Sequence, residues 1–92
     1  AQSLNNIGLI YESQVDYAKA IDYYTKSLKI SEEIGYKEGI ASSLGNIGLI
    51  YDEQSDYNKA ISYFTKSLKI FEVIKLIFQS QVLLQVKLPS QE

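Results

Sequence analysis

The chain lacks the residues on which most small catalytic and metal sites depend. It has no cysteine and no histidine, so these residues can form no disulfide, thiol nucleophile or Cys/His zinc site, and no imidazole titrates near neutral pH. Arginine is absent too, and the nine basic residues are lysines set among eleven acidic residues, for a net charge of −2. No basic stripe for a phosphate backbone results, and we expect no nucleic-acid partner.

Long apolar runs are also missing. No stretch of about 18 or more apolar residues is present, and no charged-then-apolar leader opens the chain. We therefore expect no membrane partner and a cytoplasmic location. Ala1 falls inside the repeating pattern described next, and no methionine precedes it, so we expect the chain to be part of a longer protein.

Two near-identical strings organise the sequence. Leu4–Tyr11 reads Leu-Asn-Asn-Ile-Gly-Leu-Ile-Tyr, and Leu44–Tyr51, 40 residues later, reads Leu-Gly-Asn-Ile-Gly-Leu-Ile-Tyr. A fixed period in the range of about 20–50 residues is typical of solenoid arrays, in which each unit buries its apolar face against its neighbours. The sequence therefore predicts stacked repeat units.

Apolar residues recur at i, i+3, i+4 and i+7, which is the spacing of one face of an α-helix. The pattern predicts an all-α chain with helices over about residues 2–14, 17–34, 37–54 and 57–88. Asp16 precedes the second helix as a candidate N-cap, and Gly35 follows it as a residue that tolerates positive φ.

Small and aromatic residues repeat together with the helices. Gly8 with Ala20, and Gly48 with Ala60, are the pairs expected where two antiparallel helices approach most closely. The recurring aromatic residues are expected to pack between helices; they are Tyr11, Tyr17, Tyr24, Tyr51, Tyr57 and Phe64.

These positions resemble the tetratricopeptide repeat, a helix–turn–helix unit. The matching residues are Leu4, Ile7, Gly8, Tyr11, Ala20 and Tyr24, then Leu44, Ile47, Gly48, Tyr51, Ala60 and Phe64. Ser27 and Ser67 stand where the family usually has alanine, and no proline ends the second helix of either unit. The resemblance implies a first unit over 1–34, a second over 35–74 and a degenerate apolar tail over 75–92. The 40-residue period is similar to the repeats of kinesin light chains and spindle-orientation adaptors.

In that variety the concave groove binds peptides or helical segments of other proteins, so the resemblance implies a non-catalytic interaction scaffold with a protein or peptide partner. The groove candidates are Asn5, Asn6, Leu9, Asn46 and Leu49. Asn6 and Asn46 resemble an asparagine ladder that hydrogen-bonds a peptide backbone, since an amide both donates and accepts. The alternative is that each asparagine bonds a neighbouring helix of its own domain. No lysine or arginine occupies the clamp positions of chaperone-tail-binding repeats.

Catalysis is not expected. The acidic pairs Glu32–Glu33 and Asp52–Glu53 stand next to helix ends on faces expected to be solvated, and no serine has a histidine partner. No loop has the carboxylate spacing that calcium requires, so we expect no metal and no cofactor.

After Ile74 the repeat signature is lost, and we expect the fourth helix to continue without a break; a third unit's first helix folding back is the alternative. We expect self-association through its apolar residues rather than capping within the monomer. The candidates are Ile74, Ile77, Phe78 and Leu84. Gln81–Leu84 lies 40 residues after Ala41–Leu44, and codons for its Gln-Val-Leu-Leu can encode Ala-Ser-Ser-Leu in another frame. A frameshift and ordinary divergence would each explain the loss of the repeat signature. The alternative function is that of a structural fragment or disrupted-gene product that self-associates through its apolar C-terminal helix and has no evolved ligand.

Overall fold

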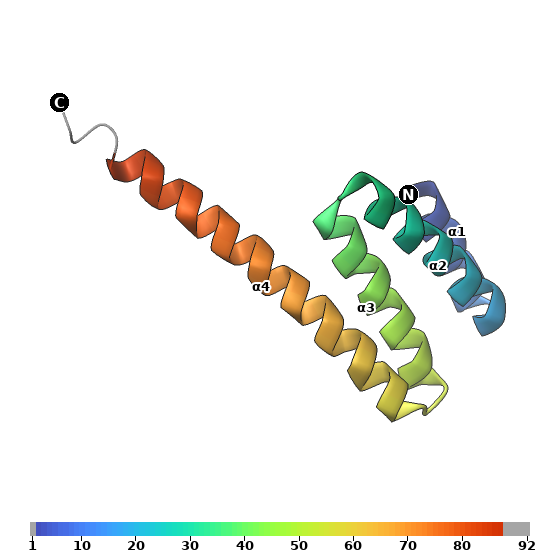
Figure 1. Cartoon of the computed structure of the whole chain (residues 1–92). Coiled ribbons are helices and arrows are strands. Elements are labelled where there is room, and N and C mark those ends of the chain that lie inside the picture. The colour runs from blue at the N-terminus through green and yellow to red at the C-terminus, as the bar shows by residue number, and fades with distance from the viewer. Residues whose placement is uncertain (1, 88–92) are drawn as a thin grey trace.

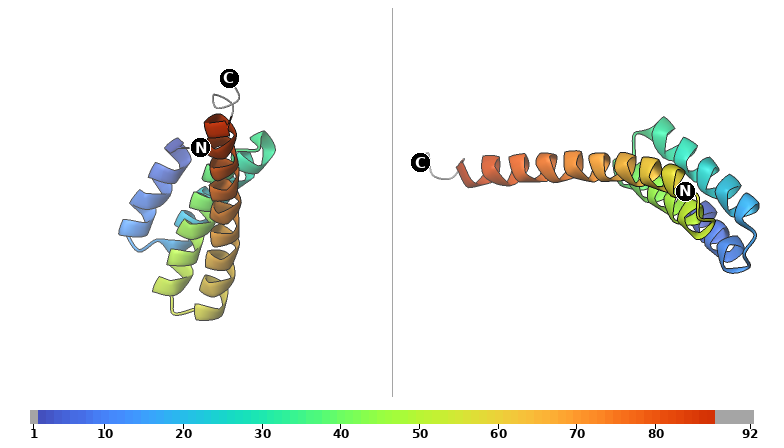
Figure 2. Two further views of the ribbon diagram at one scale, coloured as in Figure 1. Left: turned by 90° about the vertical axis from the view of Figure 1, so that its left-hand side faces the viewer. Right: turned by 90° about the horizontal axis from the view of Figure 1, so that it is seen from below.

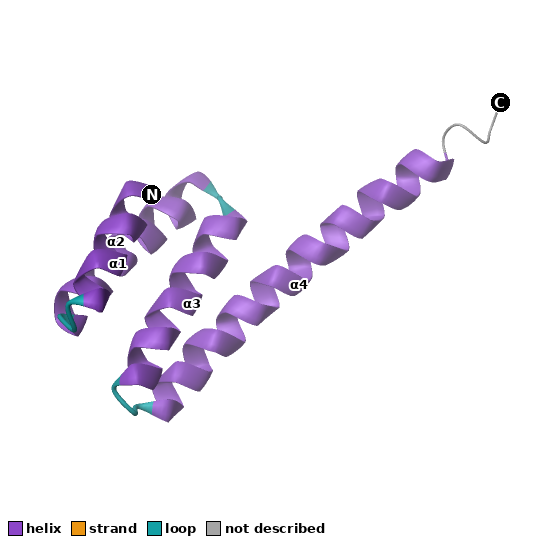
Figure 3. Cartoon of the chain, turned by 180° about the vertical axis from the view of Figure 1, so that it is seen from behind, coloured by secondary structure: helices purple, strands orange, loops and turns teal. Residues whose placement is uncertain are grey.

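The computed structural model describes residues 2–87, and within this range the chain is helical apart from short turns, with no β-strand (Figures 1 and 3). The helices are α1 (Gln2–Ser13), α2 (Tyr17–Ile34), α3 (Lys37–Glu53) and α4 (Tyr57–Lys87). The predicted all-α class is confirmed, and the predicted bounds agree with these to within one residue. The predicted last helical residue, Leu88, lies outside the described range.

The α1–α2 and α3–α4 turns are built alike. Val15 and Ser55 take the left-handed conformation, with φ of 63° and 64°, and the next residue in each turn is an aspartate. The Asp16 and Asp56 carboxylates each accept a hydrogen bond from the backbone N–H three residues further on, at 3.4 Å. These bonds satisfy N–H groups that the first turn of a helix leaves unpaired, and they confirm Asp16 as an N-cap.

The α2–α3 turn depends on Gly35. Its φ of 70° and ψ of 28° are left-handed, a conformation that costs glycine little because it has no Cβ. The Tyr36 N–H then reaches back to the Ser31 carbonyl at 2.8 Å, which closes the end of α2. The predicted role of Gly35 at the helix end is confirmed.

Each helix packs against the next, so that α1–α2 and α3–α4 form two hairpins side by side (Figures 1 and 2). Inside each hairpin an aromatic ring lies against a glycine. A Cβ added to Gly8 would lie 2.6 Å from Tyr24 Cε1, and one added to Gly48 would lie 2.9 Å from Phe64 Cδ1. The space beside these glycines is therefore taken by a ring from the partner helix, whereas the sequence suggested the small residues Ala20 and Ala60.

Two tyrosine stacks reinforce the hairpins. Tyr11 stacks on Tyr23 with ring centroids 5.5 Å apart, and Tyr51 stacks on Tyr63 at 5.6 Å. In both hairpins a lysine ammonium lies over each of these tyrosine rings, 4.9–5.3 Å from the ring centroid. These lysines are Lys19, Lys26, Lys59 and Lys66. Both contacts are favourable for a ring with a negative face and a positive edge.

The core lies between the hairpins, where α3 covers α2. Ala20 and Tyr24 of α2 form a buried cluster with Ile47 and Ile50 of α3. The two serines that replace the usual alanine are buried but hydrogen-bonded. The Ser43 hydroxyl donates to Ser27 Oγ at 3.4 Å, and the Ser67 hydroxyl donates to the Ala41 carbonyl at 2.8 Å. Burying these hydroxyls is therefore compensated by hydrogen bonds to the neighbouring helix.

Helix α4 is continuous and extends well beyond the other three (Figures 1–3). It has 31 residues, or about 46 Å at 1.5 Å per residue. The radius of gyration, 16.7 Å, consequently exceeds the roughly 12 Å expected of a compact domain of this length. The expected single long helix is confirmed over the described range. Of the helices between residues 2 and 87, none is both long and apolar enough to cross a membrane.

One packing expectation is wrong. Tyr57, at the start of α4, is 59% exposed, whereas its counterpart Tyr17 is half-buried. The reason is that α3 covers α2, but within the described residues no helix follows α4 to cover it in the same way.

Candidate functional site

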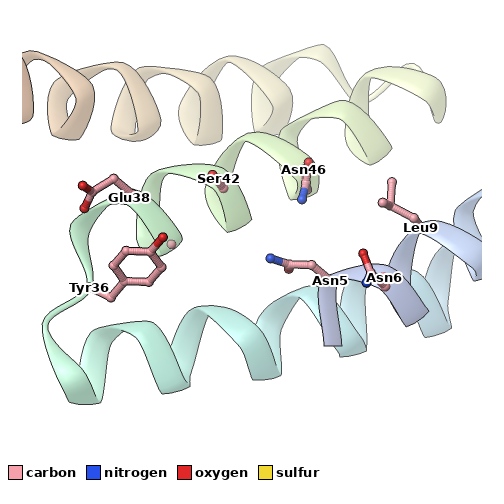
Figure 4. A pocket seen from close by; sticks show the side chains of 8 residues that line it. Asn5, Asn6, Leu9, Tyr36, Glu38, Ser42 and Asn46 are labelled. Atoms are coloured by element: carbon pink, nitrogen blue, oxygen red, sulfur yellow. The ribbon is translucent and has the colours of Figure 1, made fainter. Parts of the chain in front are cut away.

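A polar groove lies between α1 and α3, close to the predicted site residues. It has a volume of about 410 Å³. Its lining residues come from α1, the α2–α3 turn and α3; they are Asn5, Asn6, Leu9, Tyr36, Glu38, Gly39, Ser42 and Asn46. Figure 4 shows that Asn46 projects from α3 toward the space in which Asn5 and Asn6 of α1 lie. Four of the five predicted groove residues therefore meet at one place.

The three asparagines differ in their surroundings. The Asn5 amide oxygen is buried and has no hydrogen-bond partner, Asn6 is exposed and Asn46 is half-buried. Among the residues that the structure describes, the Asn6 and Asn46 side chains also have no hydrogen-bond partner. The alternative in which each asparagine bonds its own domain therefore finds no hydrogen bond to support it in residues 2–87.

The two predicted leucines do not lie together. Leu9 lines the groove beside Asn5, one helical turn further along α1, whereas Leu49 is exposed on α3 outside the lining. Leu49 follows Asn46 by three residues, so it extends the same face of α3 toward the helix end. Leu49 therefore does not line the groove.

The sequence argument did not identify the α3 residues at the other end of the groove. Glu38, Ser42 and Asn46 are spaced i, i+4, i+8 and form one row on α3, and Tyr36 lies just before this helix. The positions 40 residues before Tyr36 and Glu38 fall before Ala1, so the repeat offers no comparison for them. A search for polar residues at i−4 and i−8 from Asn46 could have found this row.

Charge in the groove comes from a single side chain. Among the lining residues, Glu38 is the only ionisable acid and no lysine is present. The asparagine amides and the Tyr36 and Ser42 hydroxyls both donate and accept hydrogen bonds, whereas the Glu38 carboxylate only accepts them. The groove can therefore pair with both the donors and the acceptors of a partner.

A second polar cluster lies toward the opposite end of α1. The Tyr24 hydroxyl donates to Glu12 Oε1 at 2.9 Å. Burial raises the pKa of the Glu12 carboxyl above its ordinary value of 4.5, and the nearby Glu53 carboxyl raises it further, while the bond from Tyr24 opposes the shift. Burial, followed by Glu12, raises the pKa of Tyr24, and the Glu53 carboxylate raises the pKa of Tyr17. This cluster joins α1, α2 and α3 and makes their packing sensitive to the charge of Glu12.

Metal-ligating groups do not gather in the described part of the chain. Residues 2–87 contain no group of three or more histidine, cysteine, aspartate or glutamate side chains placed to hold an ion. The Glu12–Glu53 pair lacks a third ligand.

The predicted self-association residues divide into two sets along α4. Ile74 is half-buried, and with Ile77 it borders a shallow depression beside the α2–α3 turn, lined also by Gly35, Lys37 and Glu38. Phe78 and Leu84 are exposed on the projecting part of the helix. The structure therefore places Ile74 against the chain's own hairpins, whereas Ile77, 46% exposed, is largely uncovered like Phe78 and Leu84.

Antiparallel helix pairs that repeat every 40 residues and stack through a shared core define the chain as an all-α, solenoid-type repeat protein. A comparison with protein-family models matches the tetratricopeptide repeat over residues 1–72. The chain belongs to the tetratricopeptide repeat family, whose members generally act as protein–protein interaction modules without catalytic activity. A comparison with curated proteins gives no match.

Proposed function

We propose that the chain is a non-catalytic interaction module that binds a peptide or helical segment of another protein in the groove between α1 and α3. The supporting observation is that Asn5, Asn6 and Asn46 line one groove, and that the amide oxygen of Asn5 is buried without a partner. A buried acceptor left unpaired costs about 1–3 kcal/mol. If the Asn5 amide turns toward the groove, a ligand N–H can bond this oxygen and recover that cost, and a peptide backbone supplies such donors.

The amides and the acid have separate roles in this proposal. Asn6 and Asn46 both donate and accept, and so can pair with successive peptide groups of an extended segment. Glu38, at the turn end of the groove, would favour a lysine, an arginine or an α-amino group. Leu9 supplies an apolar contact on the opposite wall.

A random peptide library displayed on phage is the direct test. Peptides selected on the wild-type chain should bind Asn6→Ala and Asn46→Ala variants about 5- to 150-fold more weakly, because losing a hydrogen bond to a group buried in the complex costs about 1–3 kcal/mol. Asn58→Ala is the matched control, since Asn58 is exposed at the start of α4, away from the groove lining. Failure to enrich any peptide, or equal binding to all three variants, would contradict the proposal.

A second candidate function is self-association through the projecting end of α4, without an evolved ligand. The exposed apolar side chains there support it, with Phe78 64% exposed, because contiguous apolar surface on a soluble chain favours association. Leu84→Glu should then lower the association constant measured by light scattering. Ser62→Glu, which adds the same charge at an exposed polar position of α4 outside the projecting end, should not.

A further inference from the structure

The interface between the two hairpins uses surfaces of which the chain has two copies. Within the chain, α3 covers α2, and Ile50 of α3 is fully buried in the cluster with Ala20 and Tyr24. The Ser43–Ser27 hydrogen bond crosses the same interface at 3.4 Å. The contact between α2 and α3 is therefore largely apolar and includes one buried pair of hydrogen-bonded serines.

Helix α4 repeats the surface of α2 that α3 covers, but on α4 the described residues leave this surface exposed. Residues 57–70 repeat residues 17–30 with three differences, and one of these, Phe64 for Tyr24, preserves the ring. Ile61 and Leu68 are each 62% exposed, whereas their counterparts Ile21 and Leu28 are half-buried. We call the surface formed by Tyr57, Ile61, Phe64 and Leu68 the open face of α4.

Helix α1 carries the α3 side of this interface a second time, and residues 2–87 do not cover it. Residues 4–11 differ from residues 44–51 at one position only, Asn5 in place of Gly45. Ile10 is 55% exposed, although its counterpart Ile50 is fully buried. We call the surface formed by Ser3, Ile7 and Ile10 the outer face of α1. Figure 1 shows that α1 and α4 lie on opposite sides of the array, so one chain cannot join its own two faces.

We propose that the outer face of α1 in one copy docks on the open face of α4 in a second copy and reproduces the α3–α2 interface between chains. The occupant is a second copy because each chain has both halves of an interface that it already forms internally. All three residues of the outer face are identical to their α3 counterparts Ser43, Ile47 and Ile50. Apolar surface exposed at both ends is thereby removed from water.

This contact joins two different surfaces, so it is heterologous and does not close into a dimer. Each added copy leaves one outer face and one open face free at the ends, and the array grows by one pair of hairpins at a time. The asparagine groove opens on another side of α1, since Leu9 rather than Ile10 lines it. Peptide binding and assembly can therefore be tested separately.

Complementation between two variants tests the proposal. Ile10→Glu spoils the outer face and leaves the open face intact, and Ile61→Glu does the reverse. In sedimentation velocity over a concentration series, the wild type should grow in mean mass without stopping at two chains. Each variant alone should remain a 10.4-kDa monomer, and an equimolar mixture should form a dimer of one chain of each kind that grows no further.

Three controls separate this contact from other causes. Leu9→Glu places the same charge on the residue before Ile10, on the groove side of α1, and should assemble as the wild type does. Leu68→Glu should repeat the behaviour of Ile61→Glu, and circular dichroism at 222 nm should give wild-type helix content for every variant. A wild type that is monomeric throughout, a mixture that stays monomeric, or assembly that survives Ile10→Glu but is lost with Leu84→Glu would each overturn the proposal.

Discussion

Replacing Gly8 by alanine should destabilise the chain, although alanine is the better helix former. The added Cβ would lie 2.6 Å from Cε1 and 2.8 Å from Cδ1 of Tyr24, whereas carbon atoms pack best at about 3.5–4.0 Å. The ring must therefore retreat by about 1 Å. It has little room to do so, because Tyr24 is fully buried and its hydroxyl bonds Glu12 at 2.9 Å.

The magnitude follows from two opposed terms. Gly→Ala within a helix gains about 1 kcal/mol, and forcing an extra carbon into a filled core costs about 1–3 kcal/mol. Gly45→Ala is the matched control, since its Cβ would meet only Ser67 Oγ at 3.6 Å, an ordinary contact. Gly45→Ala should therefore gain up to about 1 kcal/mol, and Gly8→Ala should lie about 1–3 kcal/mol below it.

Thermal unfolding followed by circular dichroism at 222 nm measures this difference. For a domain of this size, 1 kcal/mol corresponds to about 4–8 °C, so the two variants should differ by at least about 4 °C. The comparison should be made at equal and low protein concentration, because association raises the apparent stability of an assembling chain. Equal unfolding temperatures for Gly8→Ala and Gly45→Ala would refute the packing described for Tyr24.

Three further predictions concern single interactions. Ser67→Ala should lower the free energy of unfolding in urea by about 0.5–1.5 kcal/mol, because it removes the buried bond to the Ala41 carbonyl. Gly35→Ala, where a Cβ meets no atom within 4 Å but φ is +70°, should cost about 1 kcal/mol from backbone strain alone. The raised pKa of Glu12 means that its contribution to stability is full below its ordinary value of 4.5 and is lost as pH rises through the folded value. At pH 7 the free energy of unfolding of Glu12→Gln should therefore exceed that of the wild type by a few tenths of a kcal/mol, a small amount because this site is partly exposed. The difference between the two free energies should disappear near pH 4.

The helices could be predicted from the sequence because their signals are local. Apolar spacing sets each helix, and Asp16 and Gly35 mark ends through bonds and dihedral angles within a few residues of themselves. The 40-residue repeat then predicted that adjacent hairpins would pack in the same way. Tyr57 shows where that reasoning failed: a repeat pattern predicts a buried face, but burial also needs a following helix.

The candidate site was predicted only in part. Asn5, Asn6, Leu9 and Asn46 could be placed together because they belong to the repeated strings, and the structure brings them to one groove. Glu38 has no repeated counterpart, so the period gave no reason to select it. Contacts across a hairpin, such as Tyr11 on Tyr23, depend on the rotation of two helices about their axes, which the spacing of apolar residues does not determine closely enough.

The tyrosine stacks determine what optical spectroscopy can report about this chain. It has eight tyrosines and no tryptophan, so its emission and most of its near-ultraviolet circular dichroism come from tyrosine. Both stacked pairs join the two helices of a single hairpin, and neither pair bridges α2 and α3. If the two hairpins separated while each stayed folded, both tyrosine stacks would remain. The exciton signal of these pairs would therefore report whether each hairpin is folded, but it would not report whether the two hairpins are packed together.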